Sequence, residues 1–201
     1  MRTADPELHR QRRQQIVGAA VELFATKGLA KTTTAEICRA AGVSTGNLFH
    51  YFPSKLAIFY ALFEVDRDEW DELFAATAAD PDPWAGLMRV VDQLAADAAH
   101  PVLAGLLVEI FAQAHRDPEC AALVAEGDQR MLRGITALVE RLVADGRADP
   151  VVPPPDAARW VLTTTDAFHT RGYPEPDRDR TTEIAQAKQV IARLLGHPEG
   201  R

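Results

Sequence analysis

Residues 33–55 read TTAEICRAAGVSTGNLFHYFPSK, and this stretch decides the fold because it holds two short capped helices separated by a glycine turn. Thr33 followed by Glu36 forms a capping box, in which each side chain can bond the backbone amide of the other residue. Gly42 ends the first helix, because the residue after a helix C-terminus often takes a positive φ that glycine adopts without a clash. Ser44 is a favoured N-cap for the second helix. The pattern predicts a helix-turn-helix.

The second of these helices has an apolar side and a polar side. Leu48 and Tyr51 can pack back on the first helix, whereas Thr45, Asn47 and His50 point elsewhere. A helix of about two turns with small polar residues on its outer side fits a DNA major groove, which is about 12 Å wide. The alternative is an ordinary hairpin of two helices inside a helical core, which is a far commoner structure.

Several motifs here resemble the DNA-binding head of TetR/AcrR-type transcriptional repressors. They are Gly28, Thr32 to Thr34, the run ICRAAGV from Ile37 to Val43, the pattern Ser44-x-Gly46-x-Leu48-Phe49-His50-Tyr51-Phe52, and Ser54-Lys55. The resemblance spans roughly the first 60 residues. It implies an all-α fold with a three-helix DNA-binding head at residues 1–53 and a helical ligand-binding and dimerisation body at residues 54–201.

The exposed residues of this region divide into expected phosphate contacts and expected base contacts. Thr33 and Thr34 lie at one helix N-terminus and Lys55 at the next, where free amides and the helix dipole favour a phosphate. Tyr51 is expected to join them. Phe49 replaces a tyrosine that is common in the family, so its ring is expected to pack against sugar. The expected base readers are Ser44, Thr45, Asn47 and His50, with Gly46 allowing close approach of the backbone.

Charge is divided unevenly along the chain, whose overall net charge is −7. Residues 1–55 hold eight Lys and Arg against four Asp and Glu, whereas the remainder holds 14 basic and 25 acidic residues. A basic head suits phosphate binding, and an acidic body repels DNA and so orients the encounter. Double-stranded operator DNA is therefore the expected partner.

Composition favours a helical protein without a cofactor or metal. The 201 residues, 47% of them hydrophobic, fit one or two domains with a sizeable core. Cys38 and Cys120 show no ligand spacing with each other or with histidines, and we expect both to be buried small residues. The polar N-terminus is unlike a signal peptide and no run reaches 18 apolar residues, so the expected location is the cytoplasm without membrane contact.

Helical periodicity continues beyond the helix-turn-helix, and no strand pattern competes with it. The expected helices cover residues 9–27, 55–78, 84–99, 102–116, 120–144, 155–170 and 181–195, with breaks that include Gly28 and residues 172–176. By resemblance the body holds an inducer pocket. Its candidate lining residues are bulky or adaptable: Trp84, Met88, Phe111, His115, Met131 and Trp160.

The last two expected helices each carry an apolar stripe. Such stripes can complete the monomer core or form a four-helix bundle with a second subunit. The resemblance favours the bundle, with interface residues Val161, Phe168, Ile184, Ile191 and Leu194. A homodimer would also place two recognition helices on one face of the duplex.

The resulting hypothesis is a ligand-responsive transcriptional repressor that binds operator DNA as a homodimer and is released by a small-molecule inducer. Two other classes stay open. An enzyme is not expected, because GxSxG, HExxH and P-loop motifs are missing, but an all-α enzyme without a recognisable motif remains an alternative. A helical protein-interaction module would explain the helices, although it would not explain the basic first segment.

Overall fold

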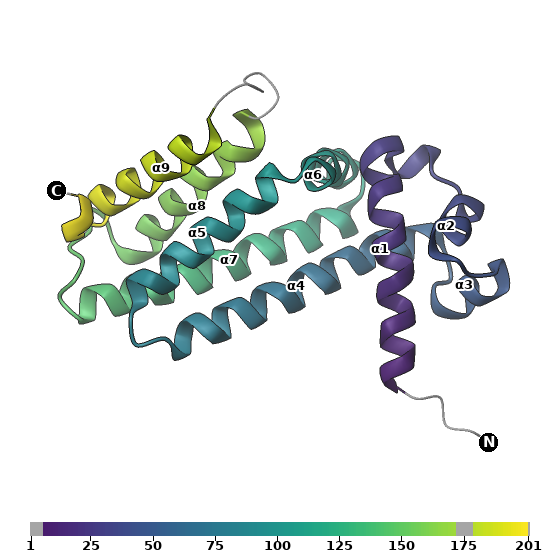
Figure 1. Cartoon of the computed structure of the whole chain (residues 1–201), viewed down its shortest axis with the longest axis horizontal. Helices are drawn as coiled ribbons and strands as arrows, with labels where there is room; N and C mark the ends of the chain where they lie inside the picture. The colour runs from purple at the N-terminus through teal and green to yellow at the C-terminus, as the bar shows by residue number, and fades with distance from the viewer. Residues whose placement is uncertain (1–5, 172–178, 201) are drawn as a thin grey trace. The chain divides into compact units, whose positions relative to one another are not determined.

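The computed structural model describes residues 6–171 and 179–200, and within them every regular element is a helix (Figure 1). The expected all-α fold is confirmed. The predicted break at residues 172–176 lies outside the described residues. The elements are α1 (Pro6–Lys31), α2 (Thr34–Ala41), α3 (Thr45–Tyr51), α4 (Lys55–Ala79), α5 (Pro83–Ala99), α6 (Pro101–Ala114), α7 (Pro118–Ala144), α8 (Pro154–Arg171), α9 (Arg180–Leu194) and the short 3-10 helix η1 (Pro198–Gly200).

The helices form two compact units that interleave in sequence. One unit comprises residues 1–68 and 102–124, and the other comprises residues 69–101 and 125–201. Helices α4 and α7 therefore each contribute to both units, and α6 groups with α1 to α3. The predicted functional boundary after residue 53 stays a prediction.

The first unit buries the apolar side of α1 against α2, α3 and α4. Ile16, Phe24, Ile37 and Leu48 are fully buried in one cluster. Phe24 also meets Phe59 edge to face, with ring centroids 5.4 Å apart. Burial of each such side chain contributes roughly 1.5–3 kcal/mol, so this cluster fixes the position of the helix-turn-helix within its unit.

The second unit has its own core, in which α5, α8 and α9 pack together. Leu87, Ile135 and Ile191 are fully buried there. The C-terminal segment packs against α5, where the His197 ring stacks on the Trp84 ring with centroids 3.9 Å apart and an interplanar angle of 11°. Burial lowers the pKa of His197, so this ring is held in its neutral form.

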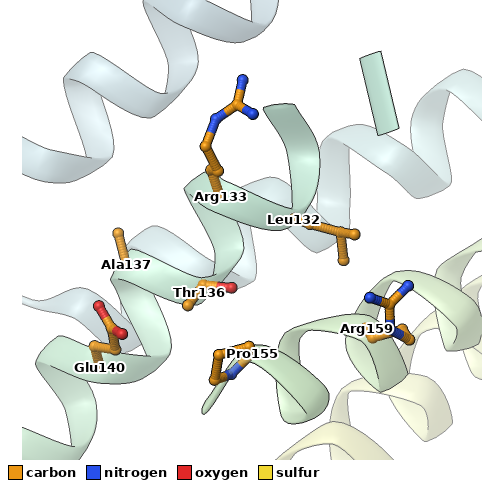
Figure 2. A pocket seen from close by; sticks show the side chains of 7 residues that line it. All are labelled: Leu132, Arg133, Thr136, Ala137, Glu140, Pro155 and Arg159. Carbon is orange, nitrogen blue, oxygen red and sulfur yellow. The ribbon is translucent and has the colours of Figure 1, made fainter. Parts of the chain in front are cut away.

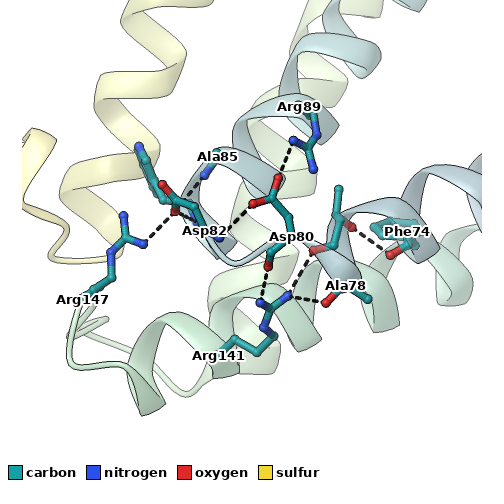
Figure 3. A network of polar contacts seen from close by, with 10 residues as sticks. Phe74, Ala78, Asp80, Asp82, Ala85, Arg89, Arg141 and Arg147 are labelled. Atoms are coloured by element: carbon teal, nitrogen blue, oxygen red, sulfur yellow. Dashed lines mark hydrogen bonds and ion pairs between the residues drawn. The ribbon is translucent and has the colours of Figure 1, made fainter.

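A polar corner joins α4 to α5 in the second unit (Figure 3). Asp82 caps α5 by accepting from the amides of Trp84 (2.9 Å) and Ala85 (3.2 Å), and Arg147 donates to the same carboxylate at 2.7 Å. This Arg147 contact is the main reason that the pKa of Asp82 is lowered. Arg141 caps the end of α4 through three carbonyl oxygens, of Thr77 (3.1 Å), Ala78 (3.2 Å) and Asp80 (2.7 Å).

Both cysteines are buried and free, as expected. Burial raises the pKa of the Cys120 thiol. Among the described residues, no single helix is long and apolar enough to cross a membrane, and one bent pair, α5 with α6, meets that test by length and composition only.

Candidate nucleic-acid interface

The helix-turn-helix is built by the caps that the sequence predicts. The Thr33 hydroxyl accepts from the Glu36 amide at 3.3 Å, and the Glu36 carboxylate accepts from the Thr33 amide at 2.9 Å. Gly42 ends α2 with φ of 64°, and the Ser44 hydroxyl accepts from the Asn47 amide at 3.2 Å. The capping box also uses the Thr33 hydroxyl as a donor to Glu36 at 2.9 Å, which leaves this hydroxyl little capacity for a phosphate.

Glu36 is held in its charged form by its neighbours. The Lys27 ammonium group, which is hydrogen-bonded to the carboxylate, is the largest cause, followed by the Thr33 amide, and together they lower the pKa of Glu36 to about 2. Lys27 is therefore an internal partner of the α2 N-terminus, because its charge is already paired with Glu36.

Helix α3 presents a polar outer side, as predicted. Leu48 is fully buried, whereas Thr45, Asn47 and His50 are exposed. Gly46, Ser44 and the half-exposed Phe49 complete this outer side. The structure therefore brings the predicted base readers together on one accessible helix.

Residues of α1 bond to the ends of α2 and α3, and no local motif indicates these contacts. Arg13 donates to the Tyr51 carbonyl oxygen at 3.2 Å and to the Glu64 carboxylate at 2.8 Å, while its guanidinium lies 4.4 Å from the centre of the Phe52 ring. Gln15 of the same helix donates to the carbonyl oxygen of Ala41 at 2.8 Å, at the end of α2. These partners lie 38, 51 and 26 residues away in sequence, beyond the reach of a local motif.

The ring of Tyr51 is half-buried and contacts two imidazoles. Its centroid is 4.8 Å from that of His9 and 5.1 Å from that of His50. This arrangement fixes the His50 ring beside the end of α3. The predicted phosphate contact of Tyr51 stays a prediction.

Lys55 makes internal contacts that its position in the sequence does not predict. Its ammonium group donates to the carbonyl oxygens of Leu29, Ala30 (3.3 Å) and Thr32 (2.5 Å), at the end of α1. An ammonium group has three N–H donors, and all three are engaged inside the chain. Lys55 therefore caps α1 and fixes the start of α4, and a phosphate contact would have to compete with this cap.

The end of α1 is also tied to α6. Gly28 breaks α1 with φ of 78° and ψ of 160°, at the predicted stop, before one last turn to Lys31. Glu109 of α6 accepts from the Leu29 amide at 2.9 Å, and a Cβ on residue 28 would lie only 2.9 Å from the same carboxylate. Gly105 of α6 is equally confined, since a Cβ there would lie 2.9 Å from the carbonyl oxygen of Ala25. Glycine is needed at position 28 for the positive φ and at position 105 for the close approach of α6 to α1.

Two cations near the helix-turn-helix are free for an external partner. The side chains of Lys31, at the end of α1, and Arg39, in α2, are exposed and have no hydrogen bond or ion pair within residues 6–171 and 179–200. Neither residue is among the contacts predicted from the sequence.

The residues predicted to line an inducer pocket lie in different surroundings, and their role stays a prediction. Trp84 and Met131 are buried core residues, and Trp160 is 56% exposed on α8. Phe111, which is 60% exposed, and His115 belong to the other compact unit.

One pocket in the second unit lies between α7 and α8 and has a volume of about 330 Å³ (Figure 2). Every residue of its lining is partly or largely exposed. The lining consists of Leu132, Arg133, Thr136, Ala137, Glu140, Pro155 and Arg159.

Two half-buried titratable groups of this unit, Asp97 and His169, interact electrostatically. Asp97 of α5 has a raised pKa, chiefly because burial disfavours its charged form. His169 of α8 has a lowered pKa for the same reason, and its Nδ1 atom is buried without a hydrogen-bond partner in the described structure. In the residues that the structure describes, no three His, Cys, Asp or Glu side chains gather as a metal site.

The predicted dimer stripe lies largely inside one chain. Val161, Phe168 and Ile191 are buried at 0%, 3% and 0% exposure, and Ile184 and Leu194 are partly buried against the same cores. The first three side chains are buried within one chain, and their assignment to an interface stays a prediction. Periodicity shows only that a stripe is buried and not what buries it.

Comparison with known proteins agrees with this architecture. Residues 16–62 match the family model described as bacterial regulatory proteins, tetR family, and residues 83–196 match the one described as BetI-type transcriptional repressor, C-terminal. The HTH-type transcriptional repressor Rv1474c of Mycobacterium tuberculosis is 32% identical over 142 residues, covering 71% of this chain and 72% of the relative.

Solved structures share the fold over nearly the whole chain. Salmonella enterica GusR is 26% identical with a TM-score of 0.74, covering 92% of this chain and 96% of that one. FadR of Bacillus subtilis, solved in complex with stearoyl-CoA, is 20% identical with a TM-score of 0.73, covering 90% and 97%, and shows the fold alone. With a helix-turn-helix at its head and a family match over more than half of its length, the chain belongs to the TetR family of bacterial transcriptional regulators.

Proposed function

We propose that this protein is a repressor that binds operator DNA as a homodimer in the cytoplasm and leaves it when a small-molecule inducer binds. The observation that carries the proposal is the outer side of α3, where Thr45, Asn47 and His50 are exposed together on a helix held rigidly by α1. A short helix with such residues outward can enter a major groove and bond to base edges.

Free cations beside α3 supply the phosphate contacts. Lys31 and Arg39 are exposed and unpaired, so their charges are available to replace the counterions of DNA. Thr34, at the start of α2, adds a hydroxyl next to free backbone amides. Thr33 and Lys55 act by positioning, since their donors are engaged in caps.

Exposed apolar residues on the last two helices support the homodimer. Trp160 of α8 is 56% exposed and Val190 of α9 is 53% exposed, on the sides of these helices that face away from the monomer core. A second copy covering this surface would bury both residues and complete a four-helix bundle. The two heads would then read half-sites one helical turn apart, about 34–36 Å.

Release by an inducer follows from linkage. A ligand that binds more tightly to a conformation with misplaced heads weakens DNA binding, and DNA weakens ligand binding by the same factor. The buried Nδ1 of His169, which has no hydrogen-bond partner among the described residues, marks a polar interior where a ligand could bond, and FadR, with the same fold, was solved with stearoyl-CoA. The contacts of α6 with α1, through Glu109 and Gly105, give the signal a route to the head.

Selection of bound duplexes from a random pool tests the proposal. The expected product is an inverted repeat with half-sites one turn apart, and a footprint of one half-site or no enrichment would contradict it. Arg39→Gln should lower the slope of log K against log salt by roughly one unit, because one phosphate contact is lost. Arg116→Gln, which removes an exposed charge at the end of α6, is the matched control and should leave the slope unchanged.

A further inference from the structure

Trp160 is the only exposed tryptophan of the three in this chain. It is 56% exposed on α8, whereas Trp70 and Trp84 are 8% and 5% exposed in the core of the second unit. An indole ring offers a large apolar surface and contributes most when it is buried, which is why tryptophan is enriched where proteins associate. Its position on an outer helix side therefore indicates a site of contact.

Arg159, the residue next to Trp160 in sequence, lines the pocket between α7 and α8. Arg159 and Pro155 line it from α8, and Leu132 and Ala137 line it from α7, so much of its lining is apolar (Figure 2). Its volume of about 330 Å³ is at the lower end of the range for ligand pockets. Because every lining residue is partly exposed, the pocket is open to the surface and suits a side chain that enters from outside.

The chemistry of the pocket matches an aromatic ring. The guanidinium of Arg159 has no hydrogen bond or ion pair in the described part of the chain, so it is free to lie against a ring face. Arginine is the cation most often found stacked on tryptophan, and this contact adds to the burial of the ring.

We propose that in the homodimer each Trp160 inserts into the α7–α8 pocket of the other subunit and stacks on its Arg159. This inference rests on the dimer of the proposed function. A two-fold axis crossing α8 near Arg159 would bring both tryptophans to both pockets at once, because the ring and the pocket are adjacent on one helix. The contact is thus self-complementary, as a two-fold interface requires.

Sedimentation equilibrium of Trp160→Ala tests the contact. The dimer dissociation constant should rise by about thirtyfold or more, as for a central aromatic anchor. Phe111→Ala, which removes another exposed aromatic from the other compact unit, is the matched control and should leave the constant unchanged. Both side chains are largely exposed, so neither variant should unfold, and circular dichroism checks this.

Filling the pocket gives an independent measurement. Ala137→Phe adds a ring at an exposed lining position, so it should weaken the dimer while Trp160 is intact. When combined with Trp160→Ala it should add little further loss, because both changes remove the same contact. Additive losses would overturn the proposal.

Failure of the inference and failure of the proposed function give different results. A wild-type dimer that Trp160→Ala leaves unchanged would overturn the insertion and leave the homodimer standing. A wild-type protein that stays monomeric at all concentrations would overturn the homodimer itself. If Ala137→Phe leaves the dimer intact but abolishes a small-molecule adduct in native mass spectrometry, the pocket belongs to a ligand and the insertion is wrong.

Discussion

Lys55→Met separates the two roles that can be given to this lysine. If its ammonium group caps α1, the substitution removes three hydrogen bonds to the carbonyl oxygens of Leu29, Ala30 and Thr32. If the group instead anchors a phosphate, the substitution removes one DNA contact and leaves the fold as it was. Methionine keeps most of the apolar stem, so the lost packing is small.

The size of the effect follows from the three bonds. A hydrogen bond from a charged donor contributes roughly 1.5–3 kcal/mol when buried, but Lys55 is only half-buried and water can reach the freed carbonyls. A total loss of about 1–2 kcal/mol is therefore expected. For a protein of this size such a loss lowers the melting temperature by about 2–8 °C.

Two assays on two variants decide the question. Thermal unfolding measures the cap, and the salt dependence of binding to random duplex measures the phosphate contact. Lys55→Arg is the second variant, because arginine keeps the charge but its planar fork cannot converge on three carbonyls in the same way. We expect both variants to melt earlier and both to keep the wild-type salt slope. A slope lowered by about one unit in Lys55→Met, with unchanged melting of both variants, would refute the capping argument.

Three further substitutions test other parts of the structure. Asn47→Ala should cost roughly 1–3 kcal/mol at one operator position, because asparagine can pair with adenine through two bonds, and an unchanged base preference in a selection would remove Asn47 from the groove. Ile191→Ala should destabilise the chain by about 2–5 kcal/mol in urea unfolding, since the side chain is fully buried. A variant that keeps wild-type stability but no longer dimerises would place Ile191 at the dimer interface. Asp97→Asn should raise the melting temperature at pH 7. Burial raises the pKa of Asp97 in the folded protein, so the contribution of this carboxyl group to stability is present below its ordinary pKa of 3.8. That contribution is lost as pH rises through the pKa of the folded state. The gain should shrink as pH falls toward 3.8, and a gain independent of pH would point to packing instead.

The sequence predicted those features whose cause is local. The capping box of Thr33 and Glu36, the turn at Gly42 and the cap at Ser44 each involve residues within three positions of one another, so their chemistry can be read from the chain. The outward direction of Asn47 followed from helical geometry once α3 was placed. These steps lead directly to the proposed DNA-binding side of the molecule.

Features that depend on distant partners could not be predicted in this way. Lys55 finds its carbonyls 23 to 26 residues away, and Glu109 meets Leu29 across 80 residues. A lysine at a helix start suggests a phosphate site until the tertiary fold reveals its other partners. What covers the stripe containing Ile191 could not be predicted for a related reason, since an apolar period is the same whether a helix is covered by its own chain or by another.

The burial of both cysteines makes the native chain suitable for distance measurements. Cys38 is 7% exposed and Cys120 is fully buried, with a thiol whose raised pKa keeps the reactive thiolate scarce. A single cysteine introduced at exposed Gln14 of α1 would therefore take up a nitroxide spin label selectively, without prior removal of the native thiols. In a homodimer the two labels would define one distance. Pulsed electron paramagnetic resonance would show how the separation of the two heads differs between the operator-bound and the inducer-bound protein.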